Sequence, residues 1–259
     1  MSEVHHRIAL VTGGAGALGR GIATRLSRDG FKIVLADMNV AACEAAAKEI
    51  GCESLAVEMD VTSVESIGSA ISRVVDRRGR IDVLVNNAGV LVKEDHSEMD
   101  EATFDRIVRV NLKGPFLVTR AVIPVMKAQR YGRLVAITSR NSLAGGMPAY
   151  GASKAGLDAL TVSWARELGA WNITANAVAP SSIAVTPGID IMNRTPEQQM
   201  AGSRHFIGRT PIQRLATRED VAGAVAYFAS EEAGFVTGET LYVAGGSQLA
   251  PVSRYGSDA

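Results

Sequence analysis

Residues 8–19 read IALVTGGAGALG, in which an apolar run from Ile8 to Val11 leads into a glycine-rich turn that ends at Gly19. A helical pattern from Arg20 to Arg28 follows directly. Glycines let the backbone turn sharply and approach a ligand closely, and the start of the following helix supplies N–H groups and a partial positive charge. A strand, a glycine turn and a helix in this order predict a loop that holds the pyrophosphate of a dinucleotide.

An acidic residue follows at the position that contacts the adenosine ribose in dinucleotide-binding folds. Asp37 lies eighteen residues after Gly19, at the end of the second apolar run. Its carboxylate can accept hydrogen bonds from both hydroxyls of an adenosine ribose and would repel a 2′-phosphate. Residues 14–16 carry no charge, Met38 adds no cation, and Arg20 is expected to face solvent. The sequence therefore predicts NAD as the cofactor in preference to NADP.

Further apolar runs alternate with helical stretches along the rest of the chain. Seven runs are expected to be strands, at residues 8–11, 32–36, 54–58, 81–85, 133–138, 173–178 and 240–244. This alternation indicates βαβ units, and nearly continuous apolar strands indicate a parallel sheet covered on both faces. With no linker dividing the chain, residues 1–259 are predicted to form one α/β domain, a doubly wound (Rossmann-type) seven-stranded parallel sheet with helices on both faces.

The least regular stretch is predicted to be a substrate lid at about residues 181–211. Four prolines occur between Pro180 and Pro211, and the segment Thr195–Arg204 could form a short helix. Long loops at the carboxyl edge of a sheet often cover substrates.

Composition excludes several functional classes. The 259 residues are 47% apolar and 21% charged, and 27 basic residues balance 27 acidic ones. Because the net charge is zero, there is no excess of positive charge to attract nucleic acid. Neither a signal peptide nor a membrane span is recognisable, which favours a cytoplasmic protein. Two cysteines, Cys43 and Cys52, and four histidines form no metal-ligand pattern, so no metal is expected.

A tyrosine and a lysine share one face of an expected helix. Tyr150 and Lys154 are four residues apart within residues 149–167, which follow the fifth strand and its terminal Ser139. The pair alone is weak evidence, but the end of that strand should open onto the same edge as the glycine loop. An ammonium near a phenol, whose ordinary pKa is about 10, favours the phenolate and so a general base.

At this point the chain resembles the short-chain dehydrogenase/reductase family over almost its whole length. Ser139 and six further motifs carry the resemblance, and they occur in the family's order. The six are TGGAGALG at residues 12–19, Asp60-Val61, Asn86 to Gly89, Asn111 in VNLKG, Tyr150 with Lys154, and Asn176 to Pro180. Three positions depart from the family pattern, namely Ala17, Ser181 and Ala244. Ser142 is a second candidate for the role of Ser139, which is preferred because it lies at the strand end.

The resemblance implies a role for each motif. Tyr150 would be the acid/base, Lys154 would lower its pKa and hold the nicotinamide ribose, and Ser139 would bond the substrate oxygen. Asn111 would support a proton-relay water. The implied cofactor contacts are Gly13, Gly16, Leu18, Gly19, Asp37, Met38, Asp60, Val61, Asn87, Ala88, Gly89, Tyr150, Lys154, Pro180, Ile183 and Thr186. The substrate contacts expected are Ser139, Asn141, Met147 and Tyr150, with Leu91, Leu143 and Ser182 as further pocket candidates.

The expected activity is hydride transfer between NAD and a small or medium neutral secondary alcohol or ketone. No dense cluster of basic residues demands an anionic substrate, and Arg140, Arg194, Arg204 and Arg209 are expected to lie at the solvated surface. A 3-oxoacyl-thioester reductase of the same family is the alternative. Two alternatives come from other functional classes. A serine hydrolase is one, because residues 151–155 nearly match G-x-S-x-G and are followed by Asp190 and His205. A non-catalytic nucleotide sensor with the same fold is the other.

The resemblance also implies a homotetramer. The stretches Asp100–Arg130 and Pro148–Leu168 carry more apolar residues than one buried face needs. Those expected at a subunit interface are Phe116, Val122, Leu160 and Trp164, with the C-terminal residues 245–259 closing the assembly.

Overall fold

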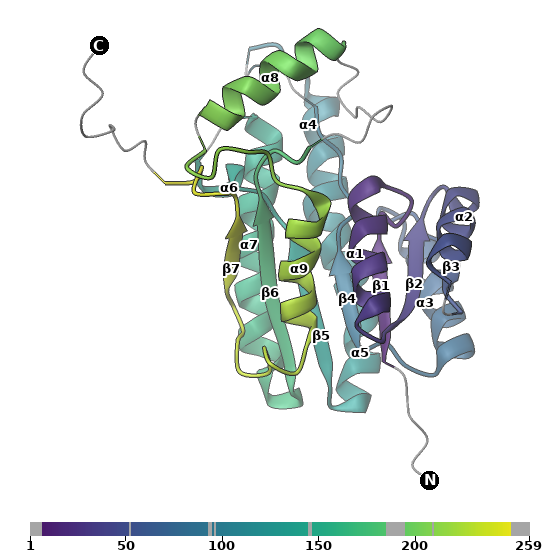
Figure 1. The fold of residues 1–259 in the computed structure, drawn as a ribbon. Helices are drawn as coiled ribbons and strands as arrows, with labels where there is room; N and C mark the ends of the chain where they lie inside the picture. Colours follow the sequence, from purple (N-terminus) through teal and green to yellow (C-terminus); the bar gives the residue numbers. More distant parts are fainter. Residues whose placement is uncertain are drawn as a thin grey trace, which may run out of the picture.

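Seven parallel strands form one sheet in the computed structural model (Figure 1). The structure describes residues 7–51, 53–92, 95, 97–144, 147–184, 195–208 and 210–249. The strand order is β3-β2-β1-β4-β5-β6-β7. The strands are β1 (Ile8–Thr12), β2 (Lys32–Asp37), β3 (Leu55–Glu58), β4 (Val83–Asn86), β5 (Gly132–Ile137), β6 (Ile173–Pro180) and β7 (Thr240–Val243). The predicted doubly wound sheet is confirmed, and its order reverses between β1 and β4, where open α/β sheets bind ligands.

Helices cover both faces of the sheet and bury its apolar strands. One face carries α1 (Ala17–Arg28), α2 (Val40–Ile50) and α9 (Arg218–Ala229), with Ile22 and Val221 in its core. The other carries α3 (Val64–Arg78), α5 (Gly114–Gln129) and α7 (Pro148–Leu168), with Ile67 and Leu157 in its core. The remaining helical elements are α4 (Glu101–Val108), α6 (Asn141–Ala144), α8 (Pro196–Gly208) and a 3-10 turn at Gly169–Trp171.

The helical stretch expected at residues 100–130 is interrupted. A π-helical turn, Arg109–Lys113, separates α4 from α5. Such turns are rare and are often found at functional sites, because the extra residue shifts side chains relative to the helix. Here the turn carries the buried Asn111.

Helix α8 confirms the short helix expected within the lid, and it runs to Gly208 rather than Arg204. Figure 1 shows α8 above the carboxyl ends of the strands. At the base of this region, Ile183 pairs with Ala216 in a parallel bridge that extends beyond β6. Much of the expected lid, residues 185–194, lies outside the described residues.

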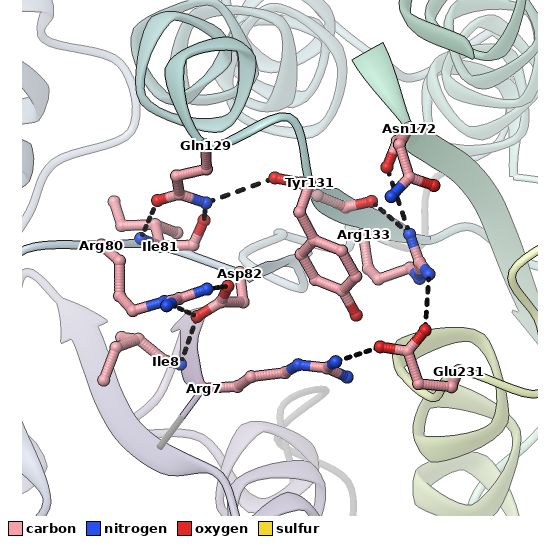
Figure 2. Close-up of polar contacts among 11 residues, drawn as sticks. Arg7, Ile8, Arg80, Ile81, Asp82, Gln129, Tyr131, Arg133, Asn172 and Glu231 are labelled. Atoms are coloured by element: carbon pink, nitrogen blue, oxygen red, sulfur yellow. Dashed lines mark hydrogen bonds and ion pairs between the residues drawn. The ribbon is translucent and has the colours of Figure 1, made fainter. Parts of the chain in front are cut away.

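A polar network closes the opposite, amino edge of the sheet (Figure 2). Asp82 is fully buried and accepts a hydrogen bond from the Ile8 amide at 2.8 Å. It also accepts from the Nε and one terminal nitrogen of Arg80, at 2.8 and 2.6 Å. The fourth strand begins at Val83, two residues later than expected, although the Asp82 backbone already bonds to both neighbouring strands, donating to the Ile8 carbonyl at 2.9 Å and accepting from the Arg133 amide at 2.8 Å.

The same network includes an arginine buried at the start of β5. Arg133 donates to the Gly132 carbonyl at 3.0 Å, pairs with Glu231 at 3.6 Å, and packs its guanidinium carbon 4.3 Å from the centre of the Tyr131 ring. Arg7 pairs with the same Glu231 and packs on the same ring at 4.6 Å. These contacts tie the ends of β1, β5 and α9 together.

No helix within the described ranges is long and apolar enough to span a membrane.

Candidate active site

The glycine loop between β1 and α1 packs so tightly that Gly13, Gly14 and Gly19 leave no space for a side chain. A Cβ on Gly13, whose φ is +65°, would lie 2.9 Å from the Nδ2 of Asn87, and one on Gly19 would collide with the carbonyl oxygen of Gly13. Gly16 is exposed and precedes α1 without a side-chain cap. The first N–H groups of α1 are therefore presented to solvent, as a pyrophosphate site requires.

The loop after β4 is bonded directly to the glycine loop. The Thr12 hydroxyl accepts hydrogen bonds from the amides of Asn87 at 3.0 Å and Ala88 at 3.1 Å. The Asn87 side chain donates to the carbonyls of Thr12 at 2.9 Å and Gly13 at 3.2 Å. The structure thus joins the glycine loop, expected at the pyrophosphate, to the loop after β4, which the family resemblance places at the adenosine ribose.

Asp37 lies at the end of β2 and faces the glycine loop. One carboxylate oxygen accepts the Ala15 amide at 3.2 Å, and the other accepts the Asn39 amide at 3.0 Å. Arg20, expected to face solvent, is half-buried and donates its Nε to the Ala15 carbonyl at 3.0 Å. That expectation was wrong because the turn leaves this carbonyl available to a long side chain. Met38 is 69% exposed beside the carboxylate.

The remaining expected cofactor residues lie along the same carboxyl edge. Asp60 accepts hydrogen bonds from the amide and hydroxyl of Thr62, both at 2.8 Å, and Val61 packs closely against Gly114. The position of the others follows from their elements: Leu18 in the first turn of α1, Gly89 after β4, Pro180 at the end of β6 and Ile183 in the bridge to Ala216. Thr186 lies outside the described residues.

The structure brings Ser139, Tyr150 and Lys154 together at this edge. Ser139 follows β5 and is buried, and its side chain lies close enough to the half-buried Tyr150 to lower the pKa of that phenol. Lys154 is 3% exposed and donates its Nζ to the Ile137 carbonyl at 2.7 Å. This Nζ lies 5.6 Å from the centre of the Tyr150 ring.

Burial moves both titrating groups of this cluster toward their neutral forms. It raises the pKa of Tyr150, an effect that the hydrogen bond from Ser139 only partly offsets. It lowers the pKa of Lys154 to about 8, against the attraction of Asp158. The pKa values of a phenol and an amine buried in this way change strongly when a further positive charge is placed beside them.

Asn111 lies in the π-helical turn, is fully buried and is bonded on three sides. Its Oδ1 accepts the Val90 amide at 2.8 Å, and its Nδ2 donates to the Val90 carbonyl at 2.8 Å and to the Ser153 hydroxyl at 3.3 Å. Both side-chain donors are therefore used within the protein. Any relay water must be held by an oxygen of Asn111, either the second lone pair of Oδ1 or the backbone carbonyl.

Comparison with known proteins agrees with this geometry. The family profile described as enoyl-(acyl carrier protein) reductase matches residues 13–248. The chain is 35% identical over 250 residues to the (2S)-[(R)-hydroxy(phenyl)methyl]succinyl-CoA dehydrogenase subunit BbsD of Thauera aromatica, covering 95% of this chain and 98% of the relative. It is 35% identical to the 3-oxoacyl-[acyl-carrier-protein] reductase of Thermotoga maritima, covering 93% and 97%. The solved structure of levodione reductase superimposes with a TM-score of 0.88 at 31% identity, covering 94% of this chain and 98% of that one.

The chain belongs to the short-chain dehydrogenase/reductase family. It is therefore an oxidoreductase of the nicotinamide-dependent kind, about 250 residues long in its matched part. The expected resemblance is confirmed over nearly the whole chain.

Membership of this family leaves no place for the hydrolase hypothesis, and the geometry opposes it directly. Ser153, the expected nucleophile of that hypothesis, lies inside α7 and is 1% exposed. A hydrolase serine needs an exposed turn between a strand and a helix. Asp190 and the side chain of His205 lie outside the described residues.

The substrate side of this dehydrogenase site is only partly described. Asn141 is buried, and its backbone N–H donates to the Ser139 hydroxyl at 3.2 Å. Met147, just before α7, is half-buried. Leu143 is largely exposed, and Leu91 and Ser182 are half-buried. The Ser142 hydroxyl has no hydrogen-bond partner in the described part of the chain, whereas Ser139 contacts Tyr150.

Arg140 is not the solvated surface residue that the sequence suggested. It is half-buried, its guanidinium carbon lies 5.6 Å from the centre of the Phe206 ring in α8, and it donates to the Ser247 carbonyl at 3.4 Å. This contact links the end of β5 to the lid helix, and nothing in the sequence spacing indicated it. Within the described ranges, no group of three or more histidine, cysteine and acidic side chains could hold a metal ion.

Proposed function

We propose that this protein interconverts a secondary alcohol and a ketone by hydride transfer with NAD. The observation that carries the proposal is the convergence of Ser139, Tyr150 and Lys154 beside the glycine loop, at the edge where both cofactor loops meet. The nicotinamide ring, when bound, takes the hydride from the carbinol carbon or returns it to the carbonyl carbon.

The roles of the side chains follow from their contacts. In the oxidative direction the substrate hydroxyl gives its proton to the Tyr150 phenolate oxygen while the hydride leaves the same carbinol group, so charge and protons balance. Ser139 donates a hydrogen bond to the substrate oxygen and thereby orients it toward Tyr150. Lys154, held by the Ile137 carbonyl, stabilises the phenolate through its ammonium charge. Bound oxidised nicotinamide would supply a second positive charge, and together with the charge of Lys154 it would offset the burial that raises the pKa of Tyr150.

The preference for NAD rests on Asp37. Its carboxylate is held in place by the amides of Ala15 and Asn39, so it cannot easily turn away from a ribose bound over the loop. A 2′-phosphate there would meet a fixed negative charge, which costs about 100-fold or more in affinity. Arg20 is committed to the carbonyl of Ala15, the residue whose amide Asp37 accepts.

Of the two substrate classes considered, a 3-oxoacyl or 3-hydroxyacyl thioester is better supported than a small neutral alcohol. Two of the similar proteins are named for acyl groups carried by coenzyme A or by acyl carrier protein. Levodione reductase, of nearly the same fold, is named for a ketone without such a carrier, which keeps the simple alcohol as the second candidate.

The deciding experiment compares both classes with both cofactors. Purified protein is assayed with a short-chain 3-hydroxyacyl-CoA, with its 3-oxo partner, and with cyclohexanol and cyclohexanone. We expect the thioester pair to give kcat/KM at least about tenfold higher than the alcohol pair, and NAD to exceed NADP. Absence of any turnover, together with retained NAD binding, would favour the non-catalytic nucleotide sensor instead.

The assembly is proposed to be a homotetramer in the cytoplasm. Of the residues expected at an interface, Phe116 is exposed and Leu160 is half-buried, but Val122 and Trp164 are buried in the core of the chain itself. The exposed apolar side chains on the same helices are Phe104, Phe116 and Val162. Light scattering at micromolar concentration tests the assembly, and a monomer there would contradict it.

A further inference from the structure

The first turn of α7, which carries Tyr150, begins at Pro148 and has no side-chain cap. The residue before the helix, Met147, has a φ of +51° and contributes no side-chain cap. An uncapped first turn leaves backbone donors unsatisfied and tends to fray. Since Tyr150 lies in this turn, something other than a cap must hold it in place.

A buried serine on the same helix provides such a contact. Ser153 is 1% exposed, and its hydroxyl donates to the carbonyl oxygen of Tyr150 at 2.7 Å. This uses the only donor of the serine, so its oxygen is free to accept, and it accepts the Nδ2 of Asn111 at 3.3 Å. The carbonyl of Tyr150 is thereby linked to a residue outside its own helix.

The orientation of Asn111 is fixed independently of Ser153. Its amide makes two hydrogen bonds with the backbone of Val90, one as acceptor and one as donor, both at 2.8 Å. A flip of the amide would break both of them, so the remaining N–H must point toward Ser153. Asn111 therefore extends the fixed loop after β4 toward α7.

Helix α7 and the π-helical turn at Arg109–Lys113 lie close enough for Ser153 and Asn111 to be hydrogen-bonded. A Cβ on Gly156, three residues after Ser153, would lie 3.0 Å from the Leu112 side chain in the π-helical turn. A larger residue would push α7 away from Asn111. The glycine and the π-helical turn together bring the serine and the asparagine within hydrogen-bond range.

We propose that Ser153 is a positioning residue, which holds Tyr150 in register with the loop after β4 by bridging the Tyr150 carbonyl and the Asn111 side chain. This inference rests on the proposed function, because it assigns to Ser153 the alignment of the acid/base. Ser153 itself touches neither substrate nor cofactor. Loss of its hydroxyl frees the first turn of α7 and weakens the alignment of the Tyr150 hydroxyl with Ser139.

The test compares Ser153→Ala with a matched substitution on the same helix. Thr161 is also 1% exposed, and its hydroxyl donates to the Leu157 carbonyl at 2.9 Å, but it lies two turns further from Tyr150. We expect Ser153→Ala to lower kcat about tenfold with both KM values within about twofold of wild type. We expect Thr161→Val to leave kcat within about twofold, even if thermal unfolding shows the two variants to be equally destabilised. An unchanged kcat in Ser153→Ala, or an equal loss in both variants, would overturn the proposal.

A second measurement does not depend on turnover. The titration of Tyr150 is followed by tyrosinate absorbance, with the signal of the matching Tyr150→Phe protein subtracted in each background. Because the hydrogen bond from Ser139 lowers the pKa of Tyr150, we expect the midpoint in Ser153→Ala to rise by about half a pH unit. An identical midpoint would refute the role of Ser153 even if no substrate were known, whereas a shifted midpoint in a protein without turnover would count against the proposed function alone.

Discussion

The ammonium nitrogen of Lys154 lies 2.7 Å from the carbonyl oxygen of Ile137, the last residue of β5. This bond attaches the middle of α7 to the strand whose continuation carries Ser139. It also places a cation in a buried position, where its charge is costly and therefore sensitive to pH.

The buried lysine predicts a pH-dependent stability. The pKa of Lys154 is about 8 in the folded chain, against an ordinary value of 10.5. Below about pH 8 the folded protein bears the full cost of the buried charge, and between pH 8 and 10.5 the unfolded chain binds more protons, so stability rises with pH. We expect the free energy of unfolding of wild type, relative to Lys154→Met, to increase by about 3 kcal/mol across this range. Urea denaturation at several pH values measures it. A difference that stays flat across this range would contradict the prediction.

Removing the phenolic hydroxyl should stop the chemistry without disturbing the cofactor site. Tyr150→Phe keeps the ring and loses the proton-transfer group, so we expect kcat to fall about 10²–10⁴-fold. NAD affinity, measured by fluorescence titration, should change little. Lys154→Met should lose both turnover and affinity, because the ammonium is proposed to serve both. Wild-type turnover in Tyr150→Phe would show that another residue is the acid/base.

Cofactor choice should follow the charge of Asp37. Wild type is expected to prefer NAD by about 100-fold in kcat/KM, and Asp37→Ser combined with Met38→Arg should move the ratio toward NADP. Asp37→Asn is the matched control, since its amide oxygen can still accept the Ala15 amide while the charge is gone. If Asp37→Asn leaves the ratio unchanged, the discrimination does not come from the carboxylate charge. A ratio near one in wild type would already reject the role of Asp37.

The amino edge should contribute stability without contributing to turnover. Asp82→Ala leaves the Ile8 amide and the Arg80 guanidinium without their partner, which we expect to cost about 2–4 kcal/mol in urea unfolding. Because the network lies at the amino ends of the strands, whereas Tyr150 lies at the start of α7 beyond the carboxyl end of β5, kcat should be unchanged at a temperature where the variant is folded. The exposed pair Arg25–Asp29 provides the contrast, and Asp29→Ala should cost less than about 1 kcal/mol. A large loss of kcat in folded Asp82→Ala would contradict this separation.

The strands of the sheet and the glycine loop at its carboxyl edge could be predicted from the sequence, because both depend on local patterns. Apolar runs and glycines mark strands and turns, and the helix expected at Pro148–Leu168 was found with those bounds. The π-helical turn at Asn111 and the contact of Arg140 with Phe206 were not predictable, since both arise from packing between segments far apart in the chain. Ser153 was considered only as a nucleophile, although its place three residues after Tyr150 on a helix already permitted a bond to the Tyr150 carbonyl. The roles of the site residues and the preference for NAD stay predictions.

The separation of the two sheet edges has a practical consequence for protein engineering. The salt-bridged end near Asp82 and Arg133 holds the ends of the strands together, whereas the loops that meet at Thr12 and Asn87 form the proposed cofactor site. Thermostabilising substitutions can be sought at the first end and altered substrate selectivity at residues 181–211, and gains at one end need not be lost at the other. A library that randomises the lid region therefore starts from a framework whose robustness it does not touch.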